Sequence, residues 1–545
     1  MTKSERSGYR KSREGVEGTW SGAIDALFAA RDQEGLPGLA LAVMKEGAVV
    51  HARGYGVAEI EHDIPFAPET VLRMGSTSKH ICAACIYLLE REGRISVEDD
   101  VRKHVPELSG LKAPVTVDHL LTMSSGLMEW LSLPIFAGMR QASPVRRVDF
   151  LAWLTRLTET MFPPGATSSY SNTNYALLSL IVERVSGQPL ADFMRDRLFA
   201  RLGMTDTRLV THMSEVVPNM AKGYDPGPEG VPVLGFMLPE IHGEGAVNTT
   251  LADMTRWYCA YREDRIAPGL RAWLEVGRPL NDGSQSPYRR GIIVDTQGGI
   301  ARVGHAGGMP GHLCEFAHFP DLDIGVVMLT NWMDPELLAQ VDPIAEIVSG
   351  RRFAEKVESA NAPPPGFYAS ESTGDAVAIA FTPDGVACHC LGEDAPLRAD
   401  GPRRWRFAKR GDARALSMDE KGTLFLHNGA LPPAALTSCG EPLPVADPAR
   451  YVGVYWCRSL GEHQIVTWDG AHLAVTTGAA TRRMMWSRLV RRTGEFFVAP
   501  IEGEDHQTNV TLRFERDAKG SVRGFDYTIS RISGLRFEKV SDAPW

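Results

Sequence analysis

The sequence predicts a multidomain chain in which a mixed α/β part is followed by an all-β part. The length of 545 residues accommodates two to four domains, at roughly 100–200 residues each. Helical and strand-like apolar runs alternate up to about residue 350, and only short alternating strands follow. Between them, the segment 358–366 holds three consecutive prolines, which cannot continue a helix or a central strand. We therefore expect domains at 1–357, 367–444 and 445–545, with a linker at 358–366.

The elements of the first domain follow from its apolar runs, taken in chain order. Residues 39–44 and 49–50 flank a short turn and predict a β-hairpin. Residues 77–91 predict a buried helix that ends at Gly93, and a second helix is expected over 173–185. Further strands are predicted at 292–294, 301–303 and 324–329, with a turn at 321–323 between the last two.

The all-β part carries a weak internal repeat. Gly-Phe-Tyr at 366–368 and Gly-Val-Tyr at 453–455 are each followed by an Asp-Gly pair, at 384–385 and 469–470. Each pair precedes a short alternating segment that reads as a strand. The repeat predicts two similar all-β modules, small antiparallel barrels or sandwiches, at 367–444 and 445–545.

The composition excludes several classes of protein. With 43% hydrophobic and 23% charged residues, the chain is neither disordered nor fibrous. The formal net charge of −9 gives no general attraction to nucleic acid or to an anionic membrane. Two basic and aromatic segments, 403–410 and 482–492, are interpreted as strands with outward arginines and not as a nucleic-acid site. No apolar window reaches about 18 residues, so no membrane span is expected.

The first residues lack the apolar stretch of an export signal, and we expect a cytoplasmic protein. Eight cysteines are too few for a disulfide scaffold in a chain of this length. Cys82 and Cys85 lie in an apolar helical run, and Cys388 and Cys390 share one face of a predicted strand. Both pairs are interpreted as core residues, so we predict neither a metal nor a cofactor.

The first chemical motif is a serine followed three residues later by a lysine, Ser76 and Lys79. If a helix starts here, both side chains lie on one face, at an end whose backbone N–H groups attract negative charge. A lysine amine in reach of a serine hydroxyl suits covalent catalysis. The same spacing recurs at Ser109 and Lys112, but prolines on both sides predict a solvated loop there.

Two further motifs accompany Ser76 and Lys79. Tyr170 and Asn172 form the only Y-x-N of the chain, just before the second helix, with Asn172 as a plausible helix cap. His305, Gly307 and Gly308 follow a predicted strand, where small residues let a substrate approach the strand edge. A similar sequence, His-Asn-Gly at residues 427–429, is interpreted as a turn in the all-β part.

The ordered set S-x-x-K, Y-x-N and H-x-G resembles the serine β-lactamase and penicillin-binding protein family, in its class C-like branch. Residues 119–127 and 243–253 also look like segments of that family, and the resemblance covers about residues 20–350. It implies an antiparallel sheet flanked by helices and a serine hydrolase without a cofactor. The chain lacks the K-[ST]-G that many members carry.

A catalytic domain followed by two small barrels resembles the D-stereospecific aminopeptidases of this family. The resemblance implies release of N-terminal D-amino acids from peptides, amides or esters with a free amine, and a homodimer. In these enzymes a third-domain loop carries an aspartate that shapes specificity. The matching loop here is 500–507, where Asp505 is the best match and Glu502 and Glu504 compete. Glu244 is a further candidate for binding the substrate amine.

The expected mechanism goes through an acyl-enzyme. Lys79 with Tyr170 takes the proton of Ser76, His305 assists, and the amides of Ser76 and Gly308 hold the oxyanion. Which of Lys79 and Tyr170 is the principal base stays open. Asn172 and Gly307 are expected to bind substrate.

Other functions on the same scaffold stay open. They are an esterase, a β-lactamase or DD-peptidase, and a non-catalytic penicillin-recognising sensor. The missing K-[ST]-G disfavours recognition of a substrate carboxylate, and the retained reactive residues disfavour the sensor.

Overall fold

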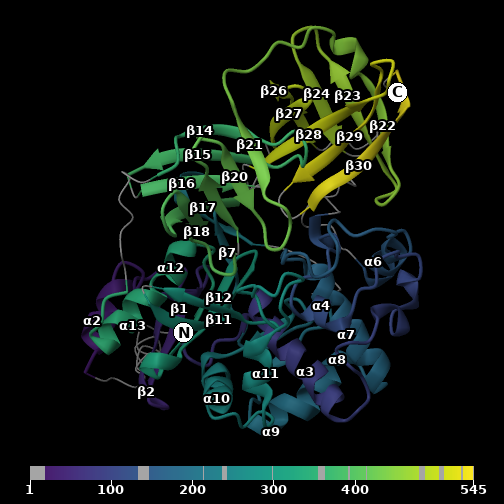
Figure 1. Ribbon diagram of the computed structural model, residues 1–545. Coiled ribbons are helices and arrows are strands. Elements are labelled where there is room, and N and C mark those ends of the chain that lie inside the picture. The colour runs from purple at the N-terminus through teal and green to yellow at the C-terminus, as the bar shows by residue number, and fades with distance from the viewer. Residues whose placement is uncertain are drawn as a thin grey trace.

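The computed structural model describes residues 19–132, 146–212, 214–235, 242–297, 299–353, 362–383, 385–390, 393–412, 414–477, 485–501, 508–529 and 532–543. The chain forms an α/β domain followed by two antiparallel β-structures (Figure 1), which confirms the predicted fold class. No helix of the described residues is long and apolar enough to span a membrane.

The α/β domain is built on a six-stranded antiparallel sheet. Its strand order is β10-β11-β12-β13-β1-β2, so strands from both ends of the domain lie side by side. The hairpin predicted near residue 39 is confirmed as β1 and β2, and the register places Leu39 of β1 opposite Thr330 of β13. The strands are β1 (Leu39–Lys45), β2 (Ala48–Tyr55), β10 (Ile293–Gln297), β11 (Ile300–Met309), β12 (His312–Phe319) and β13 (Ile324–Thr330).

Helices cover both faces of this sheet because side chains of a strand alternate between its faces. Leu39, Leu41 and Val43 of β1 join one apolar cluster, and Ala40 and Ala42 join another. The first cluster contains residues of α2 (Ser21–Phe28), α12 (Pro335–Ala339) and α13 (Val341–Ser349). The second contains residues of α3 (Lys79–Arg91), α4 (Val117–Leu121), α6 (Arg147–Leu154), α7 (Asn172–Ser186), α8 (Leu190–Met194), α10 (Leu251–Arg262) and α11 (Leu270–Val276).

Short elements complete this domain. They are the helix α9 (Ala200–Leu202) and the strands β3 (Val57–Glu59), β4 (Ile64–Pro65), β5 (Leu72–Arg73), β6 (Arg208–Leu209), β7 (Tyr224–Pro226), β8 (Pro232–Leu234) and β9 (Val247–Thr249).

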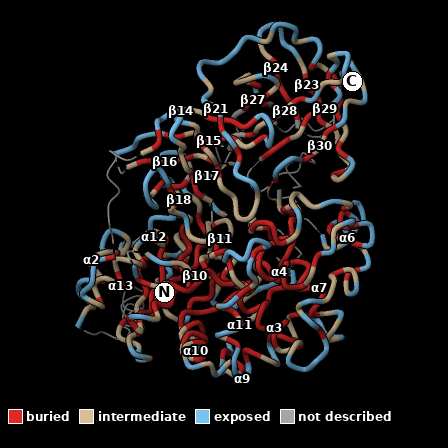
Figure 2. The backbone as a smooth tube through the Cα atoms, in the orientation of Figure 1, coloured by how far each residue is buried: buried red, intermediate tan, exposed pale blue. Residues whose placement is uncertain are grey.

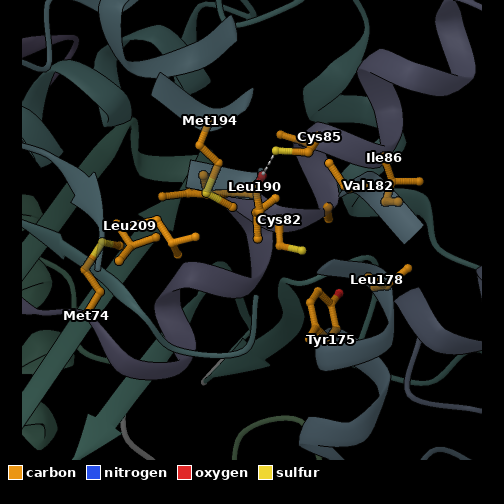
Figure 3. Packing of buried hydrophobic residues seen from close by; sticks show 14 of the residues in the cluster. Met74, Cys82, Cys85, Ile86, Tyr175, Leu178, Val182, Leu190, Met194 and Leu209 are labelled. Atoms are coloured by element: carbon orange, nitrogen blue, oxygen red, sulfur yellow. Dashed lines mark hydrogen bonds between the residues drawn. The ribbon is translucent and has the colours of Figure 1, made fainter. Parts of the chain in front are cut away.

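One part of the largest apolar cluster of the domain lies between α3, α7 and α8. Cys82 and Cys85 are fully buried there among apolar side chains, as predicted, and both are free thiols. Figure 3 shows their neighbours from three helices, which include Ile86, Tyr175, Leu178, Val182, Leu190 and Met194. The burial colouring shows the same concentration of buried chain around α3, α4, α7 and β11 (Figure 2).

The sheet corrects two predictions. The strand predicted at 301–303 extends to Met309 as β11, so His305 and Gly308 lie inside a strand and not after it. The strand β12 was missed, although all its residues are buried. Its polar residues obscure the pattern, and side chains from other elements satisfy two of them, Glu315 and His318.

The first β-structure is a closed barrel of eight strands, paired in sequence order from β14 to β21. Cys388 and Cys390 point into its apolar core, as their alternation predicted. The strands are β14 (Gly366–Ala369), β15 (Ala376–Thr382), β16 (Gly385–Cys390), β17 (Glu393–Ala399), β18 (Arg404–Phe407), β19 (Ala415–Met418), β20 (Leu424–His427) and β21 (Ala434–Cys439).

The second β-structure is a nine-stranded antiparallel sheet in the order β25-β24-β23-β22-β30-β29-β28-β27-β26. It curls around an apolar core until β25 contacts β27, so it is a nearly closed barrel. The strands are β22 (Gly453–Cys457), β23 (Glu462–Trp468), β24 (Leu473–Thr477), β25 (Met485–Arg488), β26 (Val490–Thr493), β27 (Phe496–Ile501), β28 (Thr508–Arg516), β29 (Val522–Ile529) and β30 (Ile532–Ser541).

Candidate active site

Ser76 and Lys79 lie at the junction between a 3₁₀ turn, Gly75–Ser78, and the helix α3. In a 3₁₀ turn, side chains three residues apart lie one above the other. Lys79 Nζ therefore stands 2.9 Å from Ser76 Oγ. The predicted helix is confirmed, but its first turn is this tighter 3₁₀ turn, and Ser76 belongs to it.

The Lys79 amine is fully buried and held by backbone and side-chain oxygens. Nζ donates to Asn172 Oδ1 at 2.7 Å and to the backbone carbonyl of Glu244 at 2.7 Å. Both oxygens can only accept, so these contacts use N–H groups of the amine. Nζ also donates to Ser76 Oγ, so three oxygens accept from the lysine, and loss of one proton would leave a lone pair in reach of the serine hydroxyl, as a base needs.

Asn172 does not cap the helix α7, contrary to the prediction. Ser171 occupies the cap position, and the Asn172 side chain is buried inside the site. The Glu129 carboxylate holds it there, because Oε2 accepts from the backbone N–H of Asn172 at 2.6 Å and from its Nδ2 at 3.2 Å. With the nitrogen turned to Glu129, the amide oxygen faces Lys79. Oε1 of Glu129 accepts from the N–H of Leu131.

Tyr170 lies beside Lys79 and against a second tyrosine. Lys79 Nζ is 4.9 Å from the centre of the Tyr170 ring. The ring meets Tyr288 edge to face, with centroids 5.7 Å apart and an interplanar angle of 81°. The His305 ring is 6.0 Å away. The Y-x-N motif thus brings both Tyr170 and Asn172 to the lysine amine, at the point where the chain turns into α7.

The hydrogen bonds of His305 define its protonation. Nδ1 lies 2.5 Å from the backbone oxygen of Ala306, which can only accept, so Nδ1 carries the proton. Nε2 lies 3.2 Å from the hydroxyl of Tyr288 and accepts from it. Burial, followed by the neighbouring Lys79, holds the pKa of His305 well below its usual value. His305 is therefore a neutral imidazole at physiological pH.

The strand β11 runs against the 3₁₀ turn at its glycines. A Cβ atom at Gly307 would lie 1.8 Å from the backbone oxygen of Met74, so only glycine fits there. Gly75 has φ +53°, and a Cβ there would lie 2.7 Å from Gly308 N. Thr77 Oγ1 donates to the backbone oxygen of His305 at 3.1 Å. These contacts fix β11 beside Ser76. The absence of a side chain at Gly307 allows β11 to lie this close to the turn.

One edge of β11 has no strand partner at the site, among the residues that the structure describes. Among the described residues, β10 pairs with β11 only from Ile300 to Gly304, and the following residues up to Met309 pair with β12 on the other side alone. An uncovered strand edge presents backbone hydrogen-bonding groups to a peptide-like substrate.

The Glu244 side chain lies buried behind Lys79, with 6% of its surface exposed. Its Oε2 has no hydrogen-bond partner among the described residues. Burial raises the pKa of this carboxyl to about 8, and the nearby Glu129 adds to the rise, whereas Lys79 opposes it. Glu244 is therefore mostly protonated at neutral pH, and its backbone carbonyl is the group that holds Lys79.

The structure brings together the predicted residues Ser76, Lys79, Tyr170, Asn172, Glu244, His305, Gly307 and Gly308. Asp505, with its competitors Glu502 and Glu504, lies outside the described residues. The second S-x-x-K is separate from the site, since Ser109 is exposed and Lys112 pairs with Glu159 at the surface. Within the described ranges, no group of three or more histidine, cysteine, aspartate or glutamate side chains could hold a metal ion.

Two residues of the site were missed from the sequence, Glu129 and Tyr288. Glu129 lies two residues beyond the segment 119–127 that carries part of the family resemblance, and a charged residue at that place was the available signal. Tyr288 sits among serine, proline and arginine residues, and nothing local marks it. Only the fold shows that its hydroxyl reaches His305.

Residues 24–349 match the family model described as Beta-lactamase. The match spans more than half of the chain, so the chain belongs to the β-lactamase family, and the resemblance stated from the sequence is confirmed. A serine hydroxyl beside a buried lysine amine is the arrangement of an enzyme with a serine nucleophile.

Several relatives carry the name D-aminopeptidase. One from Brucella anthropi is 29% identical over 303 residues, which cover 54% of this chain and 56% of that protein. One from Gluconobacter oxydans is 27% identical over 527 residues, which cover 92% of this chain and 96% of that protein. The solved D-amino acid amidase from Ochrobactrum anthropi SV3, complexed with L-phenylalanine amide, shares the fold with a TM-score of 0.51 and 22% identity, over 60% of this chain and 97% of that one.

Proposed function

We propose that this protein is a serine hydrolase that releases N-terminal D-amino acids from peptides, amides or esters through an acyl-enzyme. The observation that carries the proposal is the contact of 2.9 Å between Ser76 Oγ and the buried Lys79 amine. The substrate class is supported by the relatives named D-aminopeptidase, one of which matches through 92% of the chain and so through both all-β parts.

In the first step, Ser76 Oγ attacks the carbonyl carbon while its proton passes to Lys79 Nζ. The bond that forms joins Oγ to that carbon, and the carbonyl oxygen becomes an oxyanion. The N–H groups of Ser76 and Gly308 stabilise it, because β11 is held against the 3₁₀ turn that contains Ser76.

In the second step, the bond to the leaving group breaks and the leaving amine takes a proton from Lys79 or Tyr170. Water then attacks the ester carbon and gives a proton to the same pair of side chains; the bond to Ser76 Oγ breaks, Oγ takes that proton back, and the amino acid is released. His305 is neutral in this scheme and acts by position, since its Nδ1 proton is held by a backbone oxygen.

The free ammonium group of the substrate is proposed to pair with a carboxylate. Asp505 is the predicted partner from the family resemblance. Glu244 is a weaker candidate than the sequence suggested, because its carboxyl is buried and its pKa is raised to about 8.

The test is the release of p-nitroaniline from D-alanine p-nitroanilide by the purified protein, with the L-isomer in parallel. We expect turnover of the D-isomer alone. Ser76→Ala should lower the turnover number by about 10⁴-fold or more, as for other serine nucleophiles. Ser109→Ala, in the second S-x-x-K, is the matched control and should leave turnover unchanged.

Two further substrates separate this proposal from its alternatives. A chromogenic β-lactam and p-nitrophenyl acetate report β-lactamase and esterase activity through the same serine. Turnover of either one by the parent chain, with no release from the D-anilide, would contradict the D-aminopeptidase assignment. It would leave the Ser76 and Lys79 chemistry in place.

A further inference from the structure

Two turns of the eight-stranded barrel reach into the α/β domain. In an antiparallel barrel, alternate turns lie at the same end. The turn between β18 and β19 and the turn between β20 and β21 therefore share one end, and the turn between β19 and β20 lies at the other. Residues of the β18–β19 turn and of the β20–β21 turn form hydrogen bonds with the α/β domain.

The turn between β20 and β21 forms hydrogen bonds with the loop that leads into Tyr170. Thr167 Oγ1 donates to Asn428 Oδ1 at 2.8 Å, and the N–H of Ala430 donates to the backbone oxygen of Ala166 at 2.8 Å. Gly429 has φ +59°, and a Cβ atom there would lie 2.7 Å from Thr167 Oγ1. Only 1% of the Thr167 surface is exposed, so the two surfaces fit closely.

This loop, residues 166–169, is short, and it also forms hydrogen bonds within the α/β domain. Thr167 precedes Tyr170 by three residues, and the intervening Ser169 donates its N–H to the backbone oxygen of Met123 at 2.9 Å. The loop is thus held from both sides, by residue 123 of its own domain and by the barrel. The Tyr170 ring comes out of this loop to lie 4.9 Å from Lys79 Nζ.

We propose that the Asn428–Gly429 turn of the barrel is a positioning element for Tyr170, so that the barrel completes the active site without touching the substrate. The proposal rests on the proposed function in one respect, the participation of Tyr170 in proton transfer. From the sequence, this same His-Asn-Gly segment is interpreted as an ordinary turn of the all-β part. Its contact with Thr167 arises only in the folded chain.

A second contact fixes the barrel independently of this turn. Arg410, between β18 and β19, donates to Glu315 Oε1 at 2.7 Å and to Asp295 Oδ2 at 3.3 Å. Glu315 stands opposite Ala306 in the register of β11 and β12. Since Arg410 anchors the barrel to the sheet, a substitution at Asn428 should change the Tyr170 loop and leave the barrel docked.

The experiment compares three variants with the parent chain. Asn428→Ala removes the acceptor for Thr167, Asn428→Asp keeps an acceptor oxygen at the same place, and Gly429→Ala places a methyl group against Thr167. Gly422→Ala is the matched control, because Gly422 is also a turn glycine of this barrel, with φ +84°, but has no atom within 4 Å of the added carbon. It places a side chain in the same left-handed region of the backbone without the collision.

The readouts are the rate at which a fluorophosphonate labels Ser76, the values of kcat and KM for the D-anilide, and the melting temperature. Displacing a catalytic group by a fraction of an ångström to one ångström costs about tenfold to a hundredfold. We expect Asn428→Ala and Gly429→Ala to lower the labelling rate and kcat by at least about tenfold, with KM nearly unchanged. Asn428→Asp should restore both rates, and Gly422→Ala should match the parent in both.

The inference would be overturned if Asn428→Ala and Gly429→Ala labelled as fast as the parent. It would also be overturned if Gly422→Ala slowed labelling equally, because the effect would then be one of barrel stability. Labelling without release from the D-anilide would contradict the proposed substrate and still test the turn. A parent chain whose Ser76 did not react at all would overturn both proposals.

Discussion

The two walls of the active site are built in different ways. The wall that carries Ser76, Lys79 and β11 belongs to the α/β domain alone, and it is fixed by backbone contacts at Gly75 and Gly307. The wall that carries Tyr170 and Asn172 is held by loops that also contact both barrels. Local sequence rules place Ser76 and Lys79, whereas β11 beside them and the whole second wall depend on contacts between segments remote in sequence.

Two methionines connect the second barrel to the wall that carries Tyr170 and Asn172. Met128 and Met161 pack against the apolar core of this barrel, and the N–H of Ser533 lies 3.4 Å from Met161 Sδ. The backbone oxygen of Met128 accepts from Thr173 Oγ1, next to Asn172. Met128 also precedes Glu129, which orients the Asn172 amide. Each barrel thus borders a segment that positions one residue of this wall.

The largest expected effect breaks the first wall. Gly307→Ala would place a Cβ atom 1.8 Å from the backbone oxygen of Met74, so either the strand or the turn must move. We expect a loss of about 3 kcal/mol or more in the free energy of unfolding, together with loss of activity. Urea unfolding followed by fluorescence measures it.

Gly308→Ala is the neighbouring control for stability. The nearest atom to its Cβ is the flexible end of Leu313, at 3.2 Å, so this substitution should cost much less stability. Equal destabilisation by both variants would show that the close approach at Gly307 is not what holds the wall.

The next largest effect is expected from a substitution in the second wall that leaves Ser76 unchanged. Glu129→Gln leaves one acceptor oxygen where the carboxylate has two, so either Asn172 or the N–H of Leu131 loses its partner. We expect kcat to fall about tenfold with little change in KM, because Asn172 no longer holds Lys79 in one place. Steady-state kinetics on the D-anilide measures it, with the exposed Glu98→Gln as control. An unchanged kcat would remove Glu129 from the positioning network.

A third test concerns the carboxyl that lies behind Lys79. The pKa of Glu244 is about 8 in the folded chain and near 4.5 when unperturbed. As pH rises from 4.5 to 8, the unfolded chain releases this proton and the folded chain retains it, so stability falls across that window. Glu244→Gln should flatten this fall by a few kcal/mol, on the order of the linked free energy.

Urea unfolding of parent and variant at pH 5 and pH 8 checks this, with the difference between the two proteins as the readout. Parallel pH dependence in the two proteins would mean that Glu244 titrates normally and that its side chain is hydrated.

The smallest effect is expected at Tyr288, which contacts Tyr170 of the second wall and His305 of β11. Tyr288→Phe keeps the ring against Tyr170 but removes the hydroxyl that donates to His305 Nε2. One neutral hydrogen bond is worth about 1 kcal/mol, so kcat should fall about fivefold or less. Tyr258→Phe, which removes a similar bond from Tyr258 to His318 away from the site, should alter stability and not kcat. Equal effects of the two on kcat would argue against a specific role of Tyr288.

The sequence allowed the Ser76 and Lys79 part of the first wall to be predicted, but not the length of β11, which runs on to Met309. The spacing of Ser76 and Lys79 is a local geometry, and a turn of either helical type brings the two side chains together. Asn172 was misplaced as a helix cap because its partners, Glu129 and Lys79, are remote in sequence. The strand β12 was missed because its polar residues are neutralised by side chains such as Arg410 from another domain. The contact of Asn428 with Thr167 could not be predicted, since it joins residues 261 positions apart.

The pairing of β1 with β13 has a consequence for biosynthesis. Leu39 finds its partner in Thr330, so the central sheet cannot close until the ribosome has delivered nearly the whole α/β domain. The reactive serine segment is translated long before that moment, in a chain that still lacks the strand β11 beside it. Since domains fold as units as they emerge, the nascent protein should acquire its reactive serine late and abruptly. The nucleophile therefore stays latent during most of translation.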